Sequence, residues 1–245
     1  MVILLSSYKG HTIFAFLMSL LFFTNPLLIA LTIIGGNLPD FDHKYKKDKV
    51  YQIIILGLVV FITLYILKLP YYLGLIIVFL GVTFFFSKHR SFTHSIFGVL
   101  TLAASLSLIV LLAYQLITNF SLITFTSHYY LLLIIIILLG FIFLNKRIFL
   151  IFLVLFLLSA LIMGPAEITA IEIIAALFLG SLSHIILDAF TPAGIKLLAP
   201  ISSKKVHKSF AIMSLIILIA FAIYLYFRHG NLIIDHISFY LSNRN

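Results

Sequence analysis

A histidine and an aspartate four residues apart, His184 and Asp188, lie near the end of a long apolar segment. Because an α-helix has 3.6 residues per turn, their side chains share one face, about 6 Å apart, and could hold one metal ion. A carboxylate on an apolar helix costs roughly 2.5–3.5 kcal/mol at the centre of a membrane, so such a residue is usually retained for a task. Pro192 and Gly194 then end the helix, which places Asp188 near one membrane face.

Three further segments carry residues with the same chemistry. They contain His11, then Asp40 and Asp42, and then His89, Arg90 and His94. The chain has no cysteine, so a transition-metal site could use only histidine, carboxylate and water. Imidazole and carboxylate donors suit zinc, and we expect zinc as the cofactor, with manganese and iron as alternatives. A bound metal would activate a water molecule, and Arg90 could bind a phosphate near a helix N-terminus.

The composition places these residues in a membrane protein. Hydrophobic residues make up 63% of the chain and charged residues only 9%, with a mean hydropathy of +1.26. No soluble domain of this length could bury so much apolar surface. The formal charge of +9 reflects Lys and Arg in short loops, as the positive-inside rule requires, and we expect no nucleic-acid partner.

The first apolar segment, 12–36, is interrupted at Thr24-Asn25-Pro26. A straight helix from His11 to Asp40 would be roughly 44 Å long and would put the two residues on opposite sides of the membrane. A break at Asn25-Pro26 would instead give two half-helices that dip in and return. We favour this re-entrant hairpin over a single spanning helix, because it brings His11 and Asp40 to the same face.

The remaining apolar segments predict about seven spanning helices. They cover residues 51–67, 70–87, 94–117, 129–144, 148–163, 168–190 and 209–227. With the hairpin, all Lys and Arg residues except Lys68, Arg228 and Arg244 fall on one side, which identifies that side as cytoplasmic. The N-terminus is then cytoplasmic and the C-terminus outside, with the tail at 231–241 along the outer interface. The fold class is therefore all-α, a polytopic helical bundle in the cell membrane, and residues 1–245 form a single integral membrane domain.

Several of the candidate residues also have a purely structural interpretation. His11 could be a polar residue at the interface, Asp40 part of a turn, and Asp42 a helix cap. His184 and Asp188 could form a hydrogen bond between helices. His43 is interpreted as part of the basic loop. Against these interpretations stands the topology, which places all four segments at cytoplasmic helix ends.

These motifs resemble the YdjM-like family of membrane-bound metal-dependent hydrolases. The matching residues are Gly10-His11, Leu38-Pro39-Asp40-x-Asp42-His43, His89-Arg90-x-x-Thr93-His94-Ser95 and Gly180-x-x-Ser183-His184-x-x-x-Asp188-x-x-Thr191-Pro192-x-Gly194. The resemblance implies a metal-dependent membrane hydrolase. It implies five metal ligands, namely His11, Asp40, His94, His184 and Asp188. It also implies supporting roles for Asp42, His89 and Arg90.

We therefore expect an enzyme that hydrolyses a phosphoester of a lipid or lipid-like substrate at the cytoplasmic face. A metal-activated water would attack, Arg90 would bind the substrate and stabilise the developing charge, and Asp42 or His89 would manage protons. The alternative is a transporter for metal ions or small solutes that uses the same His/Asp cluster. The depth of the His/Asp cluster in the membrane distinguishes the two functions. A transport site would lie near the middle of the membrane, whereas these residues are expected at one face.

Overall fold

The computed structural model describes residues 7–43, 46–120, 128–165 and 167–242, and helices dominate this part of the chain. The α-helices are α2 (Tyr8–Leu20), α3 (Pro26–Gly35), α4 (Lys47–Ile66), α5 (Tyr72–Phe86), α6 (Ile96–Phe120), α7 (His128–Phe143), α8 (Lys146–Met163), α9 (Ala170–Ala189) and α10 (Lys208–Ser242). Two short 3₁₀ helices, η1 (Pro39–Asp42) and η3 (Phe92–His94), lie in the connections. The predicted all-α class is confirmed.

Five of these helices, α4, α6, α8, α9 and α10, are long and apolar enough to cross a membrane. The apolar helices α5 and α7 are shorter. Outward-facing apolar side chains are widely exposed, as in Ile66 (71%) and Ile162 (83%), and lipid is the solvent that suits such a surface. The chain is thus a multi-pass membrane protein, while the count of seven spans stays a prediction.

The N-terminal apolar segment breaks where the sequence predicted. The side chain of Asn25 accepts a hydrogen bond from the Leu27 amide at 2.9 Å, and Pro26 occupies the first turn of α3. This pairing of a capping asparagine with a proline starts a new helix and forbids continuation of the old one. Helices α2 and α3 pack against each other and against α9. How deeply this pair enters the membrane stays a prediction.

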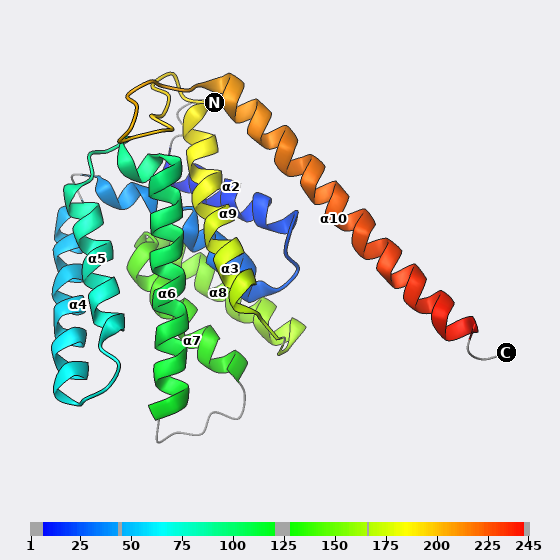
Figure 1. Ribbon diagram of the computed structural model, residues 1–245, viewed down its shortest axis with the longest axis horizontal. Coiled ribbons are helices and arrows are strands. Elements are labelled where there is room, and N and C mark those ends of the chain that lie inside the picture. The colour runs from blue at the N-terminus through cyan, green and yellow to red at the C-terminus, as the bar shows by residue number, and fades with distance from the viewer. Residues whose placement is uncertain (1–6, 44–45, 121–127, 166, 243–245) are drawn as a thin grey trace.

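The functional segments gather at one end of the bundle. Helices α4 and α6 start at this end, α5 and α9 finish there, and η1, η3 and the loop at 190–207 lie there too (Figure 1). A two-residue β-bridge ties this loop together, since Ile195 and Val206 exchange backbone hydrogen bonds of 3.1 and 2.9 Å. The opposite end carries the connection between α4 and α5 and the start of α9, capped by Thr169 and Glu172.

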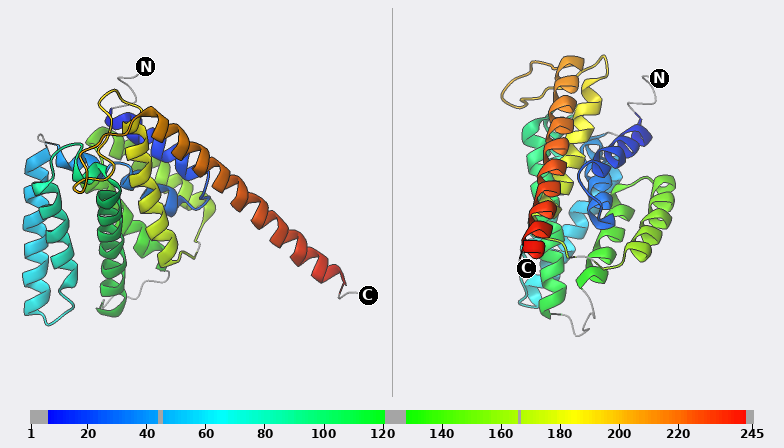
Figure 2. Two further views of the ribbon diagram at one scale, coloured as in Figure 1. Left: turned by 45° about the horizontal axis from the view of Figure 1, so that its top comes forward. Right: turned by 90° about the vertical axis from the view of Figure 1, so that its right-hand side faces the viewer.

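Helix α10 extends away from the other helices, and its far end stands clear of them in Figure 1 and in the left view of Figure 2. Its first turns pack on α9, where Ala211 is fully buried. The segment 231–241, expected to lie along the outer interface after the last span, is part of α10 itself. No proline interrupts the sequence from 208 to 242, so nothing in it forces the helix to stop earlier.

Close approach of α3 to α9 requires a glycine. A Cβ atom at Gly180 would lie 2.1 Å from the carbonyl oxygen of Thr32, well inside van der Waals contact. At the next residue of α9, Ser181 donates a hydrogen bond to the carbonyl of Gly35 at 3.2 Å. This contact fixes the register in which α9 presents His184 and Asp188 to the hairpin.

Candidate metal centre

Helix α9 presents His184 and Asp188 toward one point, as their spacing predicts. The distance from His184 Nε2 to Asp188 Oδ2 is 3.8 Å, and both side chains are buried. This distance is too long for a hydrogen bond between the two side chains, which requires about 2.7–3.2 Å. The expected bond between helices is present for His184, whose Nδ1 donates to the carbonyl oxygen of Gly36 at the end of α3 at 2.8 Å, but it uses only one ring nitrogen. Both groups instead face a common centre.

The hairpin brings His11 and Asp40 to the same centre. The His11 ring stacks on the His184 ring, with centroids 3.7 Å apart, and its Nε2 lies 3.5 Å from Asp188 Oδ1. Asp40 Oδ1 lies 3.6 Å from His184 Nε2. A straight first helix could not produce these contacts, since it would separate His11 from Asp40 by roughly 44 Å.

His94, at the end of η3, completes the group. Its Nε2 atom lies 3.2 Å from His184 Nε2, 3.4 Å from Asp188 Oδ2 and 3.8 Å from Asp40 Oδ1. The structure therefore assembles all five residues that the resemblance implied as ligands, which we call the His/Asp cluster (His11, Asp40, His94, His184 and Asp188).

Outer hydrogen bonds set the orientation of two of the imidazoles. His184 Nδ1 donates to the carbonyl oxygen of Gly36 at 2.8 Å. His94 Nδ1 lies 3.1 Å from Thr93 Oγ1, whose hydroxyl donates to Asp42 Oδ2 at 2.5 Å. In this network both Nδ1 atoms carry hydrogen, so both Nε2 atoms face the centre and offer lone pairs there when the imidazoles are neutral. Histidines that bind metals are typically held in this way.

The donor set fits a divalent cation. Two triads, His11–Asp40–His184 and His94–His184–Asp188, each offer ligand atoms that lie within 4.8 Å of one another. Nitrogen and oxygen donors in this number are typical of zinc, manganese and iron(II) sites. In addition, the buried Nδ1 atom of His11 has no hydrogen-bond partner among the described residues. A metal ion could therefore be held here.

Asp40, Asp42 and His94, which lie outside the membrane-spanning helices, shift one another's pKa values. Burial opposes ionisation of Asp40, but His184 and His94 outweigh it and hold the pKa of Asp40 well below its usual range. His89 and His94 lower the pKa of Asp42 in the same way. Burial would lower the pKa of His94, whereas its contacts with Asp40 and Asp42 raise that pKa to about 9.

Asp42 and His89 form a pair beside the cluster. Asp42 Oδ1 accepts a hydrogen bond from His89 Nδ1 at 2.8 Å, and the His89 side chain is 35% exposed while that of Asp42 is buried. His89 also lies close enough to Asp40 and His94 to form a third candidate metal triad. The ring of His43 packs edge-on against that of His89 at 4.6 Å, so His43 belongs to this site rather than to the basic loop alone.

Arg90 contacts Asp188 and Thr191 at the end of α9 and has a strained backbone conformation. Its φ angle is +58°, in the left-handed region that costs a non-glycine residue about 1–2 kcal/mol. The guanidinium donates to Thr191 Oγ1 at 3.1 Å and lies 3.5 Å from Asp188 Oδ1. These contacts leave part of the guanidinium exposed toward solvent.

Several contributors were not predicted as functional residues. Thr93, Thr191 and the Gly36 carbonyl orient the cluster, and the only sequence signal for the two threonines was their position inside the matching motifs. Glu172 lies at the opposite end of α9, and His207 is exposed, as expected. The side chains of His128, His229 and His236 lie outside the described residues.

Fold and cluster together define a multi-pass membrane protein with a buried His/Asp group that could hold a metal ion. The sequence matches the YdjM inner membrane protein family over residues 7–242, and the chain belongs to this family. The match confirms the family that the motifs indicated, whereas the metal-dependent hydrolase activity stays a prediction. Comparisons with curated proteins and with solved structures gave no match.

Proposed function

We propose that the protein is a membrane-embedded, metal-dependent hydrolase that cleaves a phosphoester of a lipid or lipid-like substrate. The observation that carries the proposal is the convergence of five side chains that could bind a metal, four of them buried and Asp40 13% exposed, beside one partly exposed histidine and one arginine. Structural hydrogen bonding alone does not require five such residues from four separate segments.

The His/Asp cluster would hold the metal, with zinc favoured by its histidines and carboxylates and manganese or iron(II) as alternatives. When bound, a divalent cation lowers the pKa of a coordinated water toward about 7 and polarises a phosphoryl oxygen. The carbonyl of Gly36 and the hydroxyl of Thr93 keep the Nε2 atoms of His184 and His94 available to it.

His89 is the proposed general acid and base. Asp42 holds the Nδ1 atom of His89 at 2.8 Å, which leaves Nε2 as the atom that accepts and returns a proton. The exposure of the His89 side chain allows a substrate group or water to reach it. Asp42 is then a positioning residue, because Thr93 and His89 occupy its oxygens.

Arg90 is the proposed phosphate-binding residue. Its guanidinium is a planar fork that matches phosphate oxygens, and Thr191 and Asp188 fix its direction. Strained backbone is often found where a side chain must be aimed, and the positive φ of Arg90 is consistent with this.

The position of the cluster favours hydrolysis over transport. Asp40 and His94 lie in 3₁₀ helices outside the candidate spans, and Asp188 is next to the last residue of α9. A transport site would be expected near the middle of the spans. At the end of the bundle, a cluster can instead meet lipid headgroups at the interface.

The test is release of phosphorylated headgroup or phosphate from a panel of phospholipids in mixed micelles. Purified metal-loaded protein should hydrolyse at least one class. His89→Gln should lose about 100-fold in rate, since general acid–base catalysis contributes at least that much, and Arg90→Lys should also be slower. Both variants should keep their metal, and Lys88→Gln, in the same loop but exposed, should behave as wild type.

Two results would contradict the proposal. One is metal-loaded protein that hydrolyses no phosphoester with zinc, manganese or iron. The other is a normal rate in the His89→Gln variant. Loss of metal from Arg90→Lys would show that Arg90 supports the metal site through Asp188 rather than binding phosphate.

A further inference from the structure

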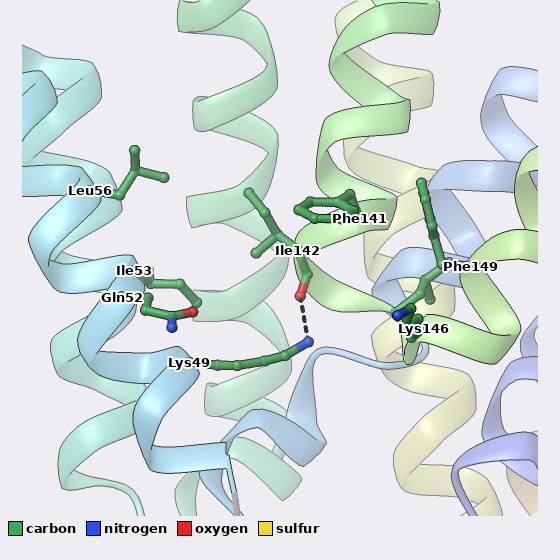
Figure 3. Close-up of a pocket in the computed structure, with 9 residues that line it drawn as sticks. Lys49, Gln52, Ile53, Leu56, Phe141, Ile142, Lys146 and Phe149 are labelled. Atoms are coloured by element: carbon green, nitrogen blue, oxygen red, sulfur yellow. Dashed lines mark hydrogen bonds between the residues drawn. The ribbon is translucent and has the colours of Figure 1, made fainter.

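A separate pocket lies between α4 and the turn that joins α7 to α8, and it shares no residue with the His/Asp cluster. Its volume is about 600 Å³. Two lysines face it, Lys49 in the first turn of α4 and Lys146 at the start of α8 (Figure 3). Lys49 donates a hydrogen bond of 3.4 Å to the carbonyl oxygen of Ile142.

The polar groups occupy one end of this pocket. Figure 3 shows Lys49, Gln52 and Lys146 at similar height, with Leu56 and Phe141 farther along the helices. Leu56 lies seven residues after Lys49 on α4, which places it roughly 10 Å farther along the helix axis. The pocket therefore has a cationic end and an apolar end, and Leu56 and Phe141 at the apolar end are exposed on the outward face of the bundle.

The two lysines have no anionic partner within the described part of the chain. The ion pairs found there all belong to the His/Asp cluster and its neighbours, and none includes Lys49 or Lys146. Both residues start helices at the end of the bundle where the lipid headgroups of the predicted cytoplasmic face would lie. Two unpaired cations above an apolar wall match a ligand with an anionic head and a hydrocarbon tail.

We propose that this pocket binds one anionic phospholipid. Its phosphate lies between Lys49 and Lys146, with Gln52 as an additional donor, and an acyl chain lies along Ile53, Leu56 and Phe149. The apolar wall commits the site to a lipid rather than to free phosphate, because inorganic phosphate would leave that wall uncovered. The site is independent of the proposed hydrolase function.

The experiment is native mass spectrometry of the full-length protein with phosphatidylglycerol or phosphatidylcholine of identical acyl chains. Near an interface each lysine contributes about 1 kcal/mol toward an anionic lipid, so Lys49→Gln with Lys146→Gln should weaken phosphatidylglycerol binding about 30-fold. Phosphatidylcholine binding should change little.

The matched control is Lys47→Gln with Arg147→Gln. It removes the same charge from the same two helical turns, but neither residue lines the pocket and both are exposed. The control should keep wild-type binding. Equal weakening in both double variants would overturn the proposal, because it would show that the net charge of this face attracts the lipid. Unchanged binding in the Lys49/Lys146 variant would overturn it as well.

A second measurement separates a phospholipid from a free phosphate. Leu56→Trp should fill the apolar end of the pocket and weaken phosphatidylglycerol binding about tenfold, with both lysines intact. Excess inorganic phosphate should not displace the lipid. Displacement by phosphate, or unaltered lipid binding in Leu56→Trp, would show that the pocket does not hold an acyl chain.

Discussion

His94 and His184 face each other through their Nε2 atoms at 3.2 Å, and the remaining ring nitrogen of each already has a donor role. Two lone pairs repel at this distance unless a positive charge lies between them. A proton on His94 can supply that charge, and the pKa of His94, raised to about 9 by Asp40 and Asp42 against the effect of burial, is consistent with it. A metal ion would take the place of this proton.

This exchange predicts a pH dependence of metal binding. Below pH about 9, His94 is protonated in the metal-free protein, and a metal must displace that proton because only neutral imidazole binds it. Apparent affinity for zinc should therefore rise about tenfold per pH unit from pH 7 toward pH 9. A competition titration with a chelator measures this slope. In Asp42→Asn the pKa of His94 falls, so the slope should flatten, and a flat wild-type profile would contradict the account.

Asp188 contributes charge as well as shape to the cluster. Its oxygens lie 3.4 Å from His94 Nε2 and 3.5 Å from His11 Nε2. Asp188→Asn keeps the size but removes the charge, and should weaken metal binding by more than about 100-fold, since even outer-shell changes cost 10–100-fold. Metal content after dialysis checks this. Glu172→Gln, at the other end of α9, should retain wild-type metal content.

The contact of α3 with α9 holds His184 in place at the scale of whole helices. A Cβ atom at Gly180 would meet the Thr32 carbonyl at 2.1 Å, and a backbone atom cannot yield as a side chain can. Gly180→Ala should therefore destabilise the protein by about 1–3 kcal/mol and reduce metal binding. Thermal unfolding in detergent and metal analysis check both effects. Gly140→Ala, whose Cβ would meet the Phe152 ring, should bind metal normally.

Helical periodicity explains which parts of this site the sequence could predict. His184 and Asp188 lie on one face of α9 because they are four residues apart in the sequence. The break before α3 follows from Asn25 and Pro26. The roles of Thr93 and His43 could not be predicted, because both lie in or beside irregular segments whose contacts are with residues about 50 positions away. The boundary of α10 was also missed, since apolar content falls before the helix ends.

The charge distribution makes a prediction for the whole molecule. If the N-terminal pair α2–α3 returns to its starting face, the N-terminus is cytoplasmic and the C-terminus outside. Because the chain lacks cysteine, single cysteines at Lys9 and Asn243 can be labelled with an impermeant reagent in intact cells. Asn243→Cys should react from outside and Lys9→Cys only after lysis. Labelling of Lys9→Cys from outside would contradict the hairpin.

The central claim is that one divalent metal joins α9, the hairpin and the segment before α6. Metal analysis of purified wild type beside His184→Ala tests it most directly, together with X-ray absorption at the metal edge. Wild type should carry a metal, zinc by preference, in a nitrogen and oxygen shell of about 2.0–2.2 Å, and His184→Ala should lose it. A wild-type protein without metal above background, or a His184→Ala variant with undiminished metal, would contradict the account.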